Sequence, residues 1–320
     1  MKIFIVCPDT VTGGTECLHQ LGHAINFAGC SISMFYHNES NEQKARSSFK
    51  NFKLDVVDYI EDSSVNLIIF PENLTKFTTY FSQSKKCIFW LSVDNFYPRK
   101  GISVIRDFLA KYNLRNKRLN INDTKTFSHL SQSYYSSLFL KENDITSFLI
   151  GDFLNDNFFA EADKVITRDV LKLDQICFNP AKGKKYIDYL SSNFSDLKFV
   201  PIVNMSRNEV IRTLSESKMY LDLGLHPGKD RIPREAAILG CCIATSKFGS
   251  ARNKFDVPIP ENYKFDVCIN SLNGIPDLVN KVFRDFDNEC LKFDSYRRAI
   301  RQEKDDFYNQ VACWLRSLTV

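Results

Sequence analysis

The sequence lacks several features that would point directly to a class of protein. Among its 320 residues no two cysteines are spaced as Cys-x-x-Cys, and the five histidines are scattered. Structural zinc sites use such spacings, so no metal site is predicted. No apolar run approaches the roughly 20 residues of a membrane-spanning helix. The formal net charge of only +4 argues against a dedicated nucleic-acid-binding protein, so no nucleic-acid partner is predicted.

The marks of a secreted protein are also missing. Met1 to Val6 form a short apolar run that Pro8 follows at once, without the length or the cleavage region of a signal peptide. Ten cysteines are present, most of them inside apolar stretches. Disulfide frameworks belong to small secreted chains, so reduced thiols in a cytoplasmic protein are predicted.

What the sequence does have is an alternation of short apolar runs and helical patterns. Its hydrophobic content of 44% suffices for a core, and its length fits one large or two ordinary domains. In the first half, strands are expected at 2–7, 31–37, 65–70, 87–93, 126–130 and 148–150, and helices at 15–28 and 136–142. This order indicates a parallel sheet with helices on both faces, which binds ligands at the carboxyl ends of its strands.

A second and denser series of the same kind follows. Strands are expected at 175–178, 198–203, 219–223 and 241–245, and helices at 184–193, 207–217 and 233–239. The polar stretch 161–174 suggests a linker near 155–172, and 275–318 has an amphipathic helical pattern. The sequence therefore predicts two α/β domains, 1–160 and 161–300, with a site in the cleft between them and a C-terminal helix at 301–320.

Two segments of the first domain carry candidate site residues. In CPDTVTGGTE, a flexible Gly13-Gly14 pair stands between a strand and a helix, so its N–H groups could approach a phosphate; the alternative is an ordinary turn. In WLSVDNFY, Asp94 follows a strand and is a candidate general base for a sugar hydroxyl, or simply part of a turn.

A third segment of the first domain is strongly basic. Between 99 and 118, seven lysines and arginines stand against one acid, and apolar residues interleave at roughly helical spacing. Such a helix could lie on an anionic membrane surface, or it could be a solvated face packed on its own domain.

The stretch 222–240, DLGLHPGKDRIPREAAILG, packs turn-forming and charged residues between two apolar segments. Pro233 suits the first turn of a helix that Gly240 ends. Loop N–H groups and cations directed to one spot would bind a diphosphate. Glu235 is expected in the first helical turn, where it would accept hydrogen bonds from a ribose. The residues assigned to this site are His226, Gly228, Lys229, Asp230, Arg231, Arg234 and Glu235. The alternative is that these charges form surface pairs and that His226 is structural.

Two further loops complete the candidate site. Lys182 in NPAKGKK follows the first strand of the second domain and could reach a phosphate, although a solvated helix start is equally compatible. Gly249 and Ser250 in SKFGSARN follow another strand of that domain, and the α/β order places them beside the 222–240 loop.

The order of these features resembles a glycosyltransferase of the GT-B fold. The resemblance is best over about 174–250, through NPAKG, FVPIVNMSRNEVIRTLSESKMYLDL and HPGKDRIPREAAILGCCIATSKFGS. It implies two Rossmann-like domains facing a cleft, the C-terminal one holding a nucleotide-sugar and the N-terminal one an acceptor, with the C-terminal helix packing back toward the N-terminal domain. By this resemblance Lys182 meets the donor diphosphate, Glu235 meets the ribose, and Gly13 and Gly14 approach the donor phosphates. No metal and no cofactor is required, because the nucleotide-sugar is a co-substrate.

The chain also departs from the family pattern. Many retaining members have two glutamates eight positions apart, but Pro227 stands eight residues before Glu235 and His226 lies beside it. Retention therefore cannot be inferred. A His-Pro pair also occurs in bacterial sialyltransferases of this fold, which keeps CMP-linked donors open beside UDP, GDP and dTDP sugars.

The sequence thus predicts a metal-independent glycosyltransferase that acts on a glycan or lipid-linked acceptor in bacterial surface polysaccharide synthesis. Asp94, Glu16 and His226 are the candidate catalytic residues, with Asp94 or Glu16 as the base if the transfer inverts. The expected location is the cytoplasm, peripheral to the inner face of the membrane if 99–118 contacts it. A sugar-nucleotide epimerase of the same fold and a non-catalytic carbohydrate- or partner-binding subunit are the alternatives.

Overall fold

A computed structural model describes residues 1–37, 42–96, 119–168 and 171–318 of the chain. The basic segment 99–118 lies outside the described residues. The chain divides into two compact units, Met1–Asp152 with Asp305–Val320, and Phe153–Lys304, which we call unit 1 and unit 2. The final helix, α13 (Asp294–Ser317), begins in unit 2 and ends in unit 1.

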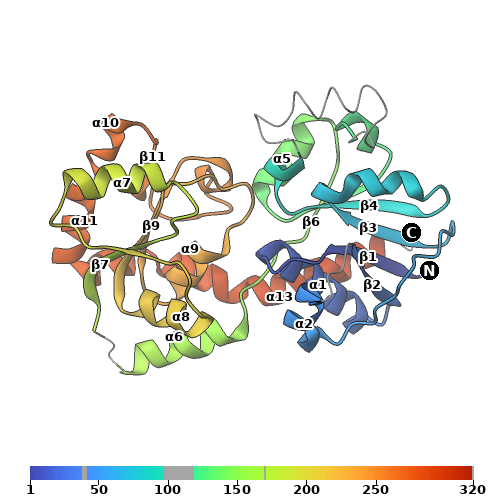
Figure 1. Cartoon of the computed structure of the whole chain (residues 1–320), viewed down its shortest axis with the longest axis horizontal. Coiled ribbons are helices and arrows are strands. Elements are labelled where there is room, and N and C mark those ends of the chain that lie inside the picture. Colours follow the sequence, from blue (N-terminus) through green and yellow to red (C-terminus); the bar gives the residue numbers. More distant parts are fainter. Residues whose placement is uncertain (38–41, 97–118, 169–170, 319–320) are drawn as a thin grey trace. The chain divides into compact units, whose positions relative to one another are not determined.

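Unit 1 is built on a parallel sheet of six strands in the order β2-β1-β3-β4-β5-β6 (Figure 1). The strands are β1 (Ile3–Pro8), β2 (Ile32–His37), β3 (Leu67–Pro71), β4 (Lys85–Trp90), β5 (Ser128–Ser131) and β6 (Phe148–Leu149). The α-helices are α1 (Gly13–Phe27), α2 (Lys44–Ser48), α3 (Val93–Phe96) and α5 (Tyr134–Glu142), and the 3₁₀ helices are η1 (Lys50–Phe52), η2 (Glu72–Tyr80) and η3 (Asn122–Thr124).

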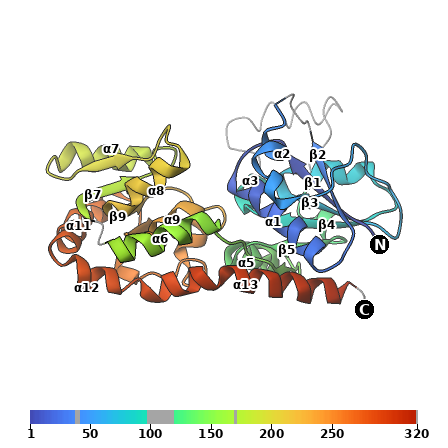
Figure 2. The ribbon, with the colours of Figure 1, turned by 90° about the horizontal axis from the view of Figure 1, so that it is seen from below.

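Unit 2 is built on a parallel sheet of five strands in the order β11-β10-β9-β7-β8. The strands are β7 (Leu173–Phe178), β8 (Phe199–Pro201), β9 (Ser217–Asp222), β10 (Cys242–Ser246) and β11 (Lys264–Phe265). The helices before the tail are α6 (Asp156–Arg168), α7 (Lys184–Asn193), α8 (Arg207–Ser215), α9 (Arg231–Ile238), η4 (Gly249–Arg252) and η5 (Glu261–Tyr263). They are followed by α10 (Ile269–Leu272), α11 (Ile275–Arg284), α12 (Phe286–Leu291) and α13, of which α12 and α13 are best seen in Figure 2.

Two Rossmann-like parallel sheets are what the sequence predicts, and both are confirmed. Helix α7 has the predicted bounds, and the tail is helical as expected. The end of α13 groups with unit 1, in agreement with a C-terminal helix that returns to the N-terminal domain.

The linker expected near 155–172 is wrong. Most of this segment forms helix α6 within unit 2. Phe158 and Ala162, four positions apart, are 4% and 0% exposed, so they form an apolar stripe along an otherwise polar helix. The high polarity of the segment reflects the solvent face of an amphipathic helix.

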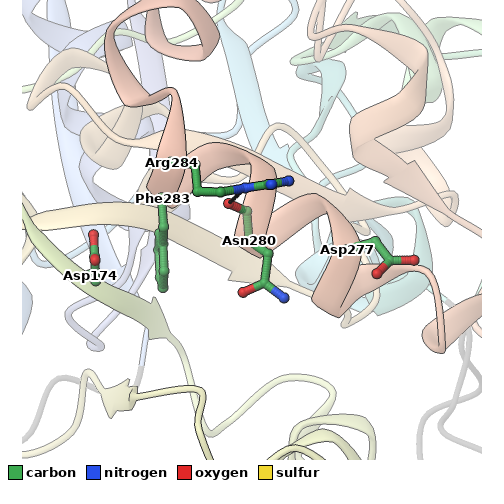
Figure 3. A pocket seen from close by; sticks show the side chains of 5 residues that line it. All are labelled: Asp174, Asp277, Asn280, Phe283 and Arg284. Carbon is green, nitrogen blue, oxygen red and sulfur yellow. Dashed lines mark hydrogen bonds between the residues drawn. The ribbon is translucent and has the colours of Figure 1, made fainter.

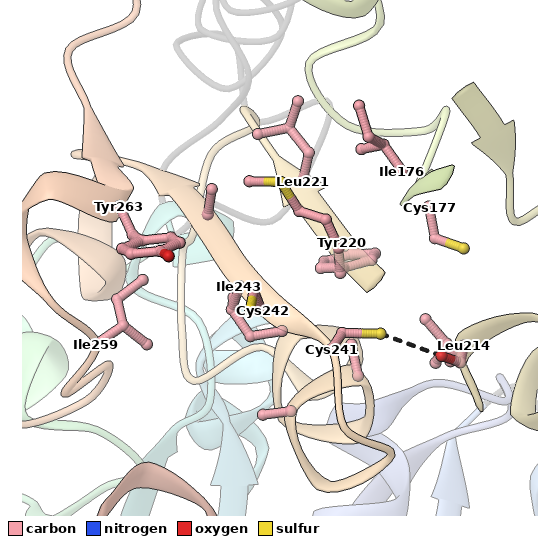
Figure 4. Close-up of a cluster of buried hydrophobic side chains, with 14 of the residues drawn as sticks. Ile176, Cys177, Leu214, Tyr220, Leu221, Cys241, Cys242, Ile243, Ile259 and Tyr263 are labelled. Carbon is pink, nitrogen blue, oxygen red and sulfur yellow. Dashed lines mark hydrogen bonds between the residues drawn. The ribbon is translucent and has the colours of Figure 1, made fainter. Parts of the chain in front are cut away.

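The core of unit 2 lies between its sheet and the covering helices. Strands β9 and β10 are buried along their length, as expected for central parallel strands (Figure 4). Ala236 and Ala237 on α9 are both 0% exposed, so this helix presents small residues to the core. The loops that follow β9 and β10 are therefore attached to well-packed strands.

Within the described residues, no helix combines the length and the apolar character needed to cross a membrane. All ten cysteines lie in the described part of the chain, and none of them forms a disulfide there.

Candidate functional site

The strand order of unit 2 reverses direction between β7 and β9. These two strands are neighbours in the sheet, but the chain continues from β7 to β8 on one side and from β9 to β10 on the other. In an open α/β sheet, the loops that leave such a point diverge and form a ligand-binding crevice at the carboxyl ends of the strands. The segments at this point are 179–183 after β7 and 223–230 after β9.

The two segments are packed against each other through glycines. Gly183 has a φ of 64°, and a Cβ added to it would lie 2.7 Å from the carbonyl carbon of Leu223. A Cβ added to Gly224 would lie 2.5 Å from Cβ of Lys182. Both contacts are too short for any side chain, so glycine is required for the backbones to approach this closely.

A third loop, 247–252, joins them from β10. Gly249 has a φ of 52°, and a Cβ on it would overlap the carbonyl oxygen of His226. Ser250 donates from its backbone N–H to the His226 carbonyl (2.9 Å) and from its hydroxyl to the Gly228 carbonyl (2.6 Å). We call 179–183, 223–230 and 247–252 the loop cluster. It brings together Lys182, His226, Gly228, Gly249 and Ser250, as the α/β order predicted.

A network of charges lies inside the loop cluster. Lys182 Nζ is 2.6 Å from Asp230 Oδ2, and His226 Nδ1 is 2.7 Å from the same oxygen. On its other side, His226 Nε2 lies 3.7 Å from Asp222 Oδ1. His226 is only 1% exposed, so its imidazole is held between two carboxylates and does not face solvent.

The electrostatics of this network favour the charged forms of His226 and Asp230. Burial lowers the pKa of His226, but the contacts with Asp230 and Asp222 outweigh burial, so its pKa is raised above the ordinary value. Burial raises the pKa of Asp230, but His226 and Lys182 outweigh it and hold the pKa of this carboxyl below the usual range. The His226 imidazole therefore lies between two carboxylates that favour its protonated form.

Asp222, His226 and Asp230 also have the chemistry of a metal-binding set. One ligand atom from each lies within 4.8 Å of the others. However, Lys182 Nζ and His226 Nδ1 both already contact Asp230 Oδ2, so this oxygen has protein partners. The absence of a metal site stays a prediction, and the contacts within this set favour it.

The two arginines of the 222–240 stretch have protein partners rather than a common direction. Arg231 donates to the Phe153 carbonyl (2.8 Å). Arg234 is 0% exposed and donates to Glu303 Oε2 (2.7 Å) and to the carbonyls of Asp230 (3.2 Å) and Lys229 (3.3 Å). Arg231 thus points to a carbonyl outside the loop, and Arg234 is buried against Glu303 and two loop carbonyls, so the two guanidinium groups do not converge with each other. Their role at a diphosphate stays a prediction.

Lys229 follows the same pattern. Its Nζ lies 2.7 Å from Glu303 Oε1, so one carboxylate of α13 pairs with both Lys229 and Arg234. Of the predicted cations, Lys182 is the one whose ammonium group pairs with Asp230 inside the loop cluster, and 27% of its side chain is accessible.

Glu235 lies in the second turn of α9, not in the first turn as expected. The helix begins at Arg231, with Asp230 as its N-cap, two residues before the predicted start at Pro233. Glu235 is half-buried, so its side chain remains accessible to a polar ligand.

In unit 1 the strand order reverses between β1 and β3, which places α1 at the corresponding crevice. Gly13 and Gly14 were expected in a loop before the helix, but they are its first two residues, because Thr12 and Thr15 form a capping box. Their N–H groups belong to the first turn, which has no intrahelical acceptors. Glu16, a candidate base, is only 5% exposed.

Asp94 is exposed at the start of α3, close to the carboxyl end of β4. Partial desolvation raises its pKa, and a hydrogen bond from the Tyr135 hydroxyl (3.5 Å) opposes this shift. Glu72, which the sequence analysis missed, is 3% exposed and accepts a hydrogen bond from the Leu91 N–H (3.0 Å). Burial raises the pKa of Glu72 to about 7. Through its bond with the Leu91 N–H, Glu72 fixes the turn that precedes Asp94.

A hollow of about 700 Å³ lies elsewhere on unit 2, lined by Asp174, Asp277, Asn280, Phe283 and Arg284 (Figure 3). Asp174 is the second residue of β7, so the hollow lies at the amino end of the sheet. Arg284 Nε bonds back to the Asn280 carbonyl of its own helix (3.3 Å). The volume of the hollow suits a ligand, but the hollow lies at the end of the sheet opposite to the one where such sheets bind nucleotides.

The His226 network gives a pH-dependent contribution to stability. A raised pKa in the folded state means that the stabilisation is complete below the unfolded value and is lost as the pH rises through the folded value. We therefore expect the difference in unfolding free energy between the wild type and His226→Gln to be largest at about pH 6 and smaller at about pH 9. Urea unfolding at both values measures it. A difference that does not change with pH would mean that the imidazole is neutral.

No model of a known protein family matches the chain, and a comparison with curated proteins found no match. Solved structures do match it. HepE (Alr3699) from Anabaena in complex with UDP has a TM-score of 0.67 and 12% identity, over 99% of this chain and 100% of that chain. It has also been solved with UDP-glucose.

Two further solved structures extend the match. Sucrose-phosphate synthase from Thermosynechococcus elongatus has a TM-score of 0.64 and 13% identity, over 100% of this chain and 99% of that chain. A glycosyltransferase from Rickettsia africae has a TM-score of 0.61 and 12% identity, over 99% of this chain and 97% of that chain. The chain has the GT-B fold of these glycosyltransferases, which confirms the fold inferred from the sequence.

Two acidic partners of the predicted residues, Asp222 and Glu303, were missed by the sequence analysis, and one of them left a signal. Asp222, His226 and Asp230 are four residues apart in turn, an acid-histidine-acid series visible in DLGLHPGKD. Glu303 left no local signal, because it lies 69 residues from Arg234.

Proposed function

We propose that the protein is a glycosyltransferase that uses a nucleotide-sugar donor, with the donor diphosphate bound at the loop cluster of unit 2. The observation that carries the proposal is the glycine-dependent packing of three strand-end loops around Lys182 at the point where the strand order reverses. Backbone N–H groups at such an edge suit a diphosphate, and a lysine adds a positive charge. The UDP and UDP-glucose complexes of HepE, which has the same fold, support a nucleotide-sugar as the ligand.

The chemistry of the proposed reaction is the attack of an acceptor hydroxyl on the anomeric carbon, with departure of the nucleoside diphosphate. The negative charge that develops on the leaving group would be met by loop N–H groups and by Lys182. Half-buried Glu235 would accept hydrogen bonds from the ribose, as the family resemblance implies. His226 would not contact the substrate directly, because its imidazole is buried. It would instead hold Asp230 in place.

For an inverting transfer, Asp94 is a better base than Glu16. Its carboxyl group is exposed, and its raised pKa brings it closer to that of a working base, whereas Glu16 is 5% exposed. We further propose that the reaction needs no metal and no cofactor, and that the acceptor is a glycan or a lipid-linked sugar in bacterial surface polysaccharide synthesis. The protein would then work in the cytoplasm, with contact to the membrane through 99–118.

Calorimetry with UDP, GDP, dTDP and CMP tests the proposal and identifies the nucleotide. Binding of one nucleotide supports it, and binding of none contradicts it. Product analysis with the donor alone separates the alternatives, because an epimerase converts the sugar without an acceptor. A non-catalytic carbohydrate-binding subunit would bind glycans without any dependence on nucleotide.

The contribution of Lys182 can be measured separately. We expect Lys182→Met to lower the affinity for the bound nucleotide by about ten- to a hundredfold, since a charge-assisted contact to phosphate contributes about 1.5–3 kcal/mol. Lys184→Met is the matched control, because Lys184 is 65% exposed and pairs with Asp188. Equal affinities for the two variants would move the diphosphate away from the loop cluster.

A further inference from the structure

A second group of reactive side chains lies in unit 2, away from the loop cluster. It consists of Cys242, Cys290, Lys172 and Arg297, which we call the thiol cluster. Cys242 is the first residue of β10, so the thiol cluster lies at the amino end of this strand, whereas the loop cluster follows carboxyl ends. Cys290 lies on α12 and Arg297 on α13.

Arg297 is fixed against the sulfur of Cys290. Its Nη2 donates to Cys290 Sγ at 2.9 Å. Its Nε donates to the Ala237 carbonyl (2.9 Å), and its Nη1 donates to the Cys290 carbonyl (2.9 Å) and to Asp294 (2.7 Å). Because these bonds hold the guanidinium in one orientation, a positive donor is permanently directed at the sulfur. Such a contact favours the thiolate over the thiol.

Cys242 is the direct neighbour of Cys290. Cys290 Sγ lies 3.6 Å from the Gly240 carbonyl oxygen, two residues before Cys242 at the start of β10, and the two thiols shift each other's pKa. Cys242 is 0% exposed, and Cys290 is partly exposed. Cys241 lies beside them on the chain, but its thiol is directed to the carbonyls of Leu214 (3.1 Å) and Ser217 (3.3 Å) (Figure 4). Cys242 is therefore the sulfur that faces Cys290.

Lys172 adds a second positive charge at this edge. It is buried, and its Nζ donates to the carbonyls of Leu239 (2.7 Å) and Ser217 (3.2 Å). Burial lowers the pKa of Lys172, and the neighbouring cysteines Cys241 and Cys290 oppose this shift. Tyr263 is the remaining titratable neighbour, and burial and a hydrogen bond to Glu289 keep it protonated.

The two thiols are unequal as a result. The interaction with Cys242 lowers the pKa of Cys290, burial opposes this shift, and Arg297 and Lys172 add to the lowering. The interaction with Cys290 and burial raise the pKa of Cys242. An accessible thiolate beside a protonated thiol is the arrangement of an attacking and a resolving cysteine.

We propose that Cys290 is a peroxide-reactive cysteine that forms a reversible disulfide with Cys242. This proposal does not depend on the proposed glycosyl transfer. It assigns a redox modification site to the side of unit 2 opposite to the loop cluster.

The reaction needs a hydroperoxide as the oxidant. The Cys290 thiolate attacks one peroxide oxygen, the O–O bond breaks, and the departing hydroxide takes up a proton to give water and a sulfenic acid. Cys242 then loses its proton and attacks Cys290 Sγ. The S–S bond forms, the S–O bond breaks, and the second oxygen leaves as water. In sum, two thiols lose two protons and two electrons, and one hydrogen peroxide becomes two waters.

The first test compares alkylation rates at about pH 6.5, where an ordinary thiol with a pKa of about 8.5 is mostly protonated. Iodoacetamide labelling followed by peptide mass spectrometry measures each cysteine in the folded protein. We expect Cys290 to react at least about ten times faster than Cys268, although Cys268 is exposed and Cys290 only partly so. A slower reaction at Cys290 would contradict the thiolate.

The second test is oxidation with hydrogen peroxide and peptide mapping without reductant. We expect a linked peptide pair containing Cys242 and Cys290, which a thiol reductant separates. In Cys242→Ser the sulfenic acid on Cys290 should persist and be captured by dimedone, and in Cys290→Ser neither product should form. Cys241→Ser is the matched control and should still form the disulfide. Absence of the linked pair in the oxidised wild type, or a link to Cys241 instead, would overturn the proposal.

Discussion

Arg234→Met should lower the free energy of unfolding by about 3–5 kcal/mol, which is the usual result of removing one partner from a buried ion pair. Arg234 is 0% exposed and bonds to Glu303, which is 9% exposed at its side chain. The substitution leaves the Glu303 charge with Lys229 as its partner, and it also removes donors from two backbone carbonyls. Urea unfolding followed by circular dichroism measures the loss.

Two further variants test whether the loss comes from the broken ion pair or from any substitution in this region. Arg298→Met changes an exposed arginine of α13 and should shift the unfolding free energy by less than about 0.5 kcal/mol. The double variant Arg234→Met with Glu303→Leu should lose less stability than Arg234→Met alone. In the double variant the Glu303 carboxylate, which would have lost its arginine partner, is also removed. A double variant that is less stable than the single one would show that Glu303 has a separate structural role.

Gly249→Ala should destabilise unit 2 by about 2–4 kcal/mol, made up of about 1–2 kcal/mol for a left-handed alanine and a further part for the backbone clash. The added methyl group would overlap the His226 carbonyl oxygen, which accepts the Ser250 N–H. Since the loops cannot keep this contact, nucleotide binding should weaken as well. Urea unfolding and calorimetry with the nucleotide found above measure the two effects.

Gly29→Ala is the control for backbone conformation. Gly29 also has a positive φ, of 79°, but a Cβ on it would meet nothing within 4 Å. It should therefore show the conformational part of the loss, about 1 kcal/mol, and leave nucleotide binding unchanged. Equal losses for Gly29→Ala and Gly249→Ala would mean that the contact between the loops contributes nothing.

Local patterns in the sequence predicted most of the fold. The apolar runs that became β9 and β10 and the helical spacing that became α7 each depend on residues a few positions apart, so they are visible without the structure. The same local logic failed at 155–172, where polarity was taken for a linker although Phe158 and Ala162 mark a helix. It also placed the start of α9 two residues late, at Pro233, which is the third residue of the helix.

The candidate site was predicted only in part. Lys182 and the glycine-containing loops follow strands of one parallel sheet, and the order of strands and helices was sufficient to bring them to one edge. The directions of Arg231 and Arg234 were not predictable, because their partners are a carbonyl at Phe153 and a carboxylate at Glu303. Charge alone does not say whether an arginine meets a ligand or the protein.

The sequence by itself determined the two parallel sheets and the loops at their carboxyl edges. Hydrophobic periodicity and turn chemistry depend on residues a few positions apart, so they can be read without the structure. Only the tertiary structure decided which charges pair, that His226 is buried between two carboxylates, and that Cys242 meets Cys290. These contacts join segments distant in sequence or depend on burial, and the energy of a charge or a thiolate is set by the partners and the solvent exclusion that folding provides.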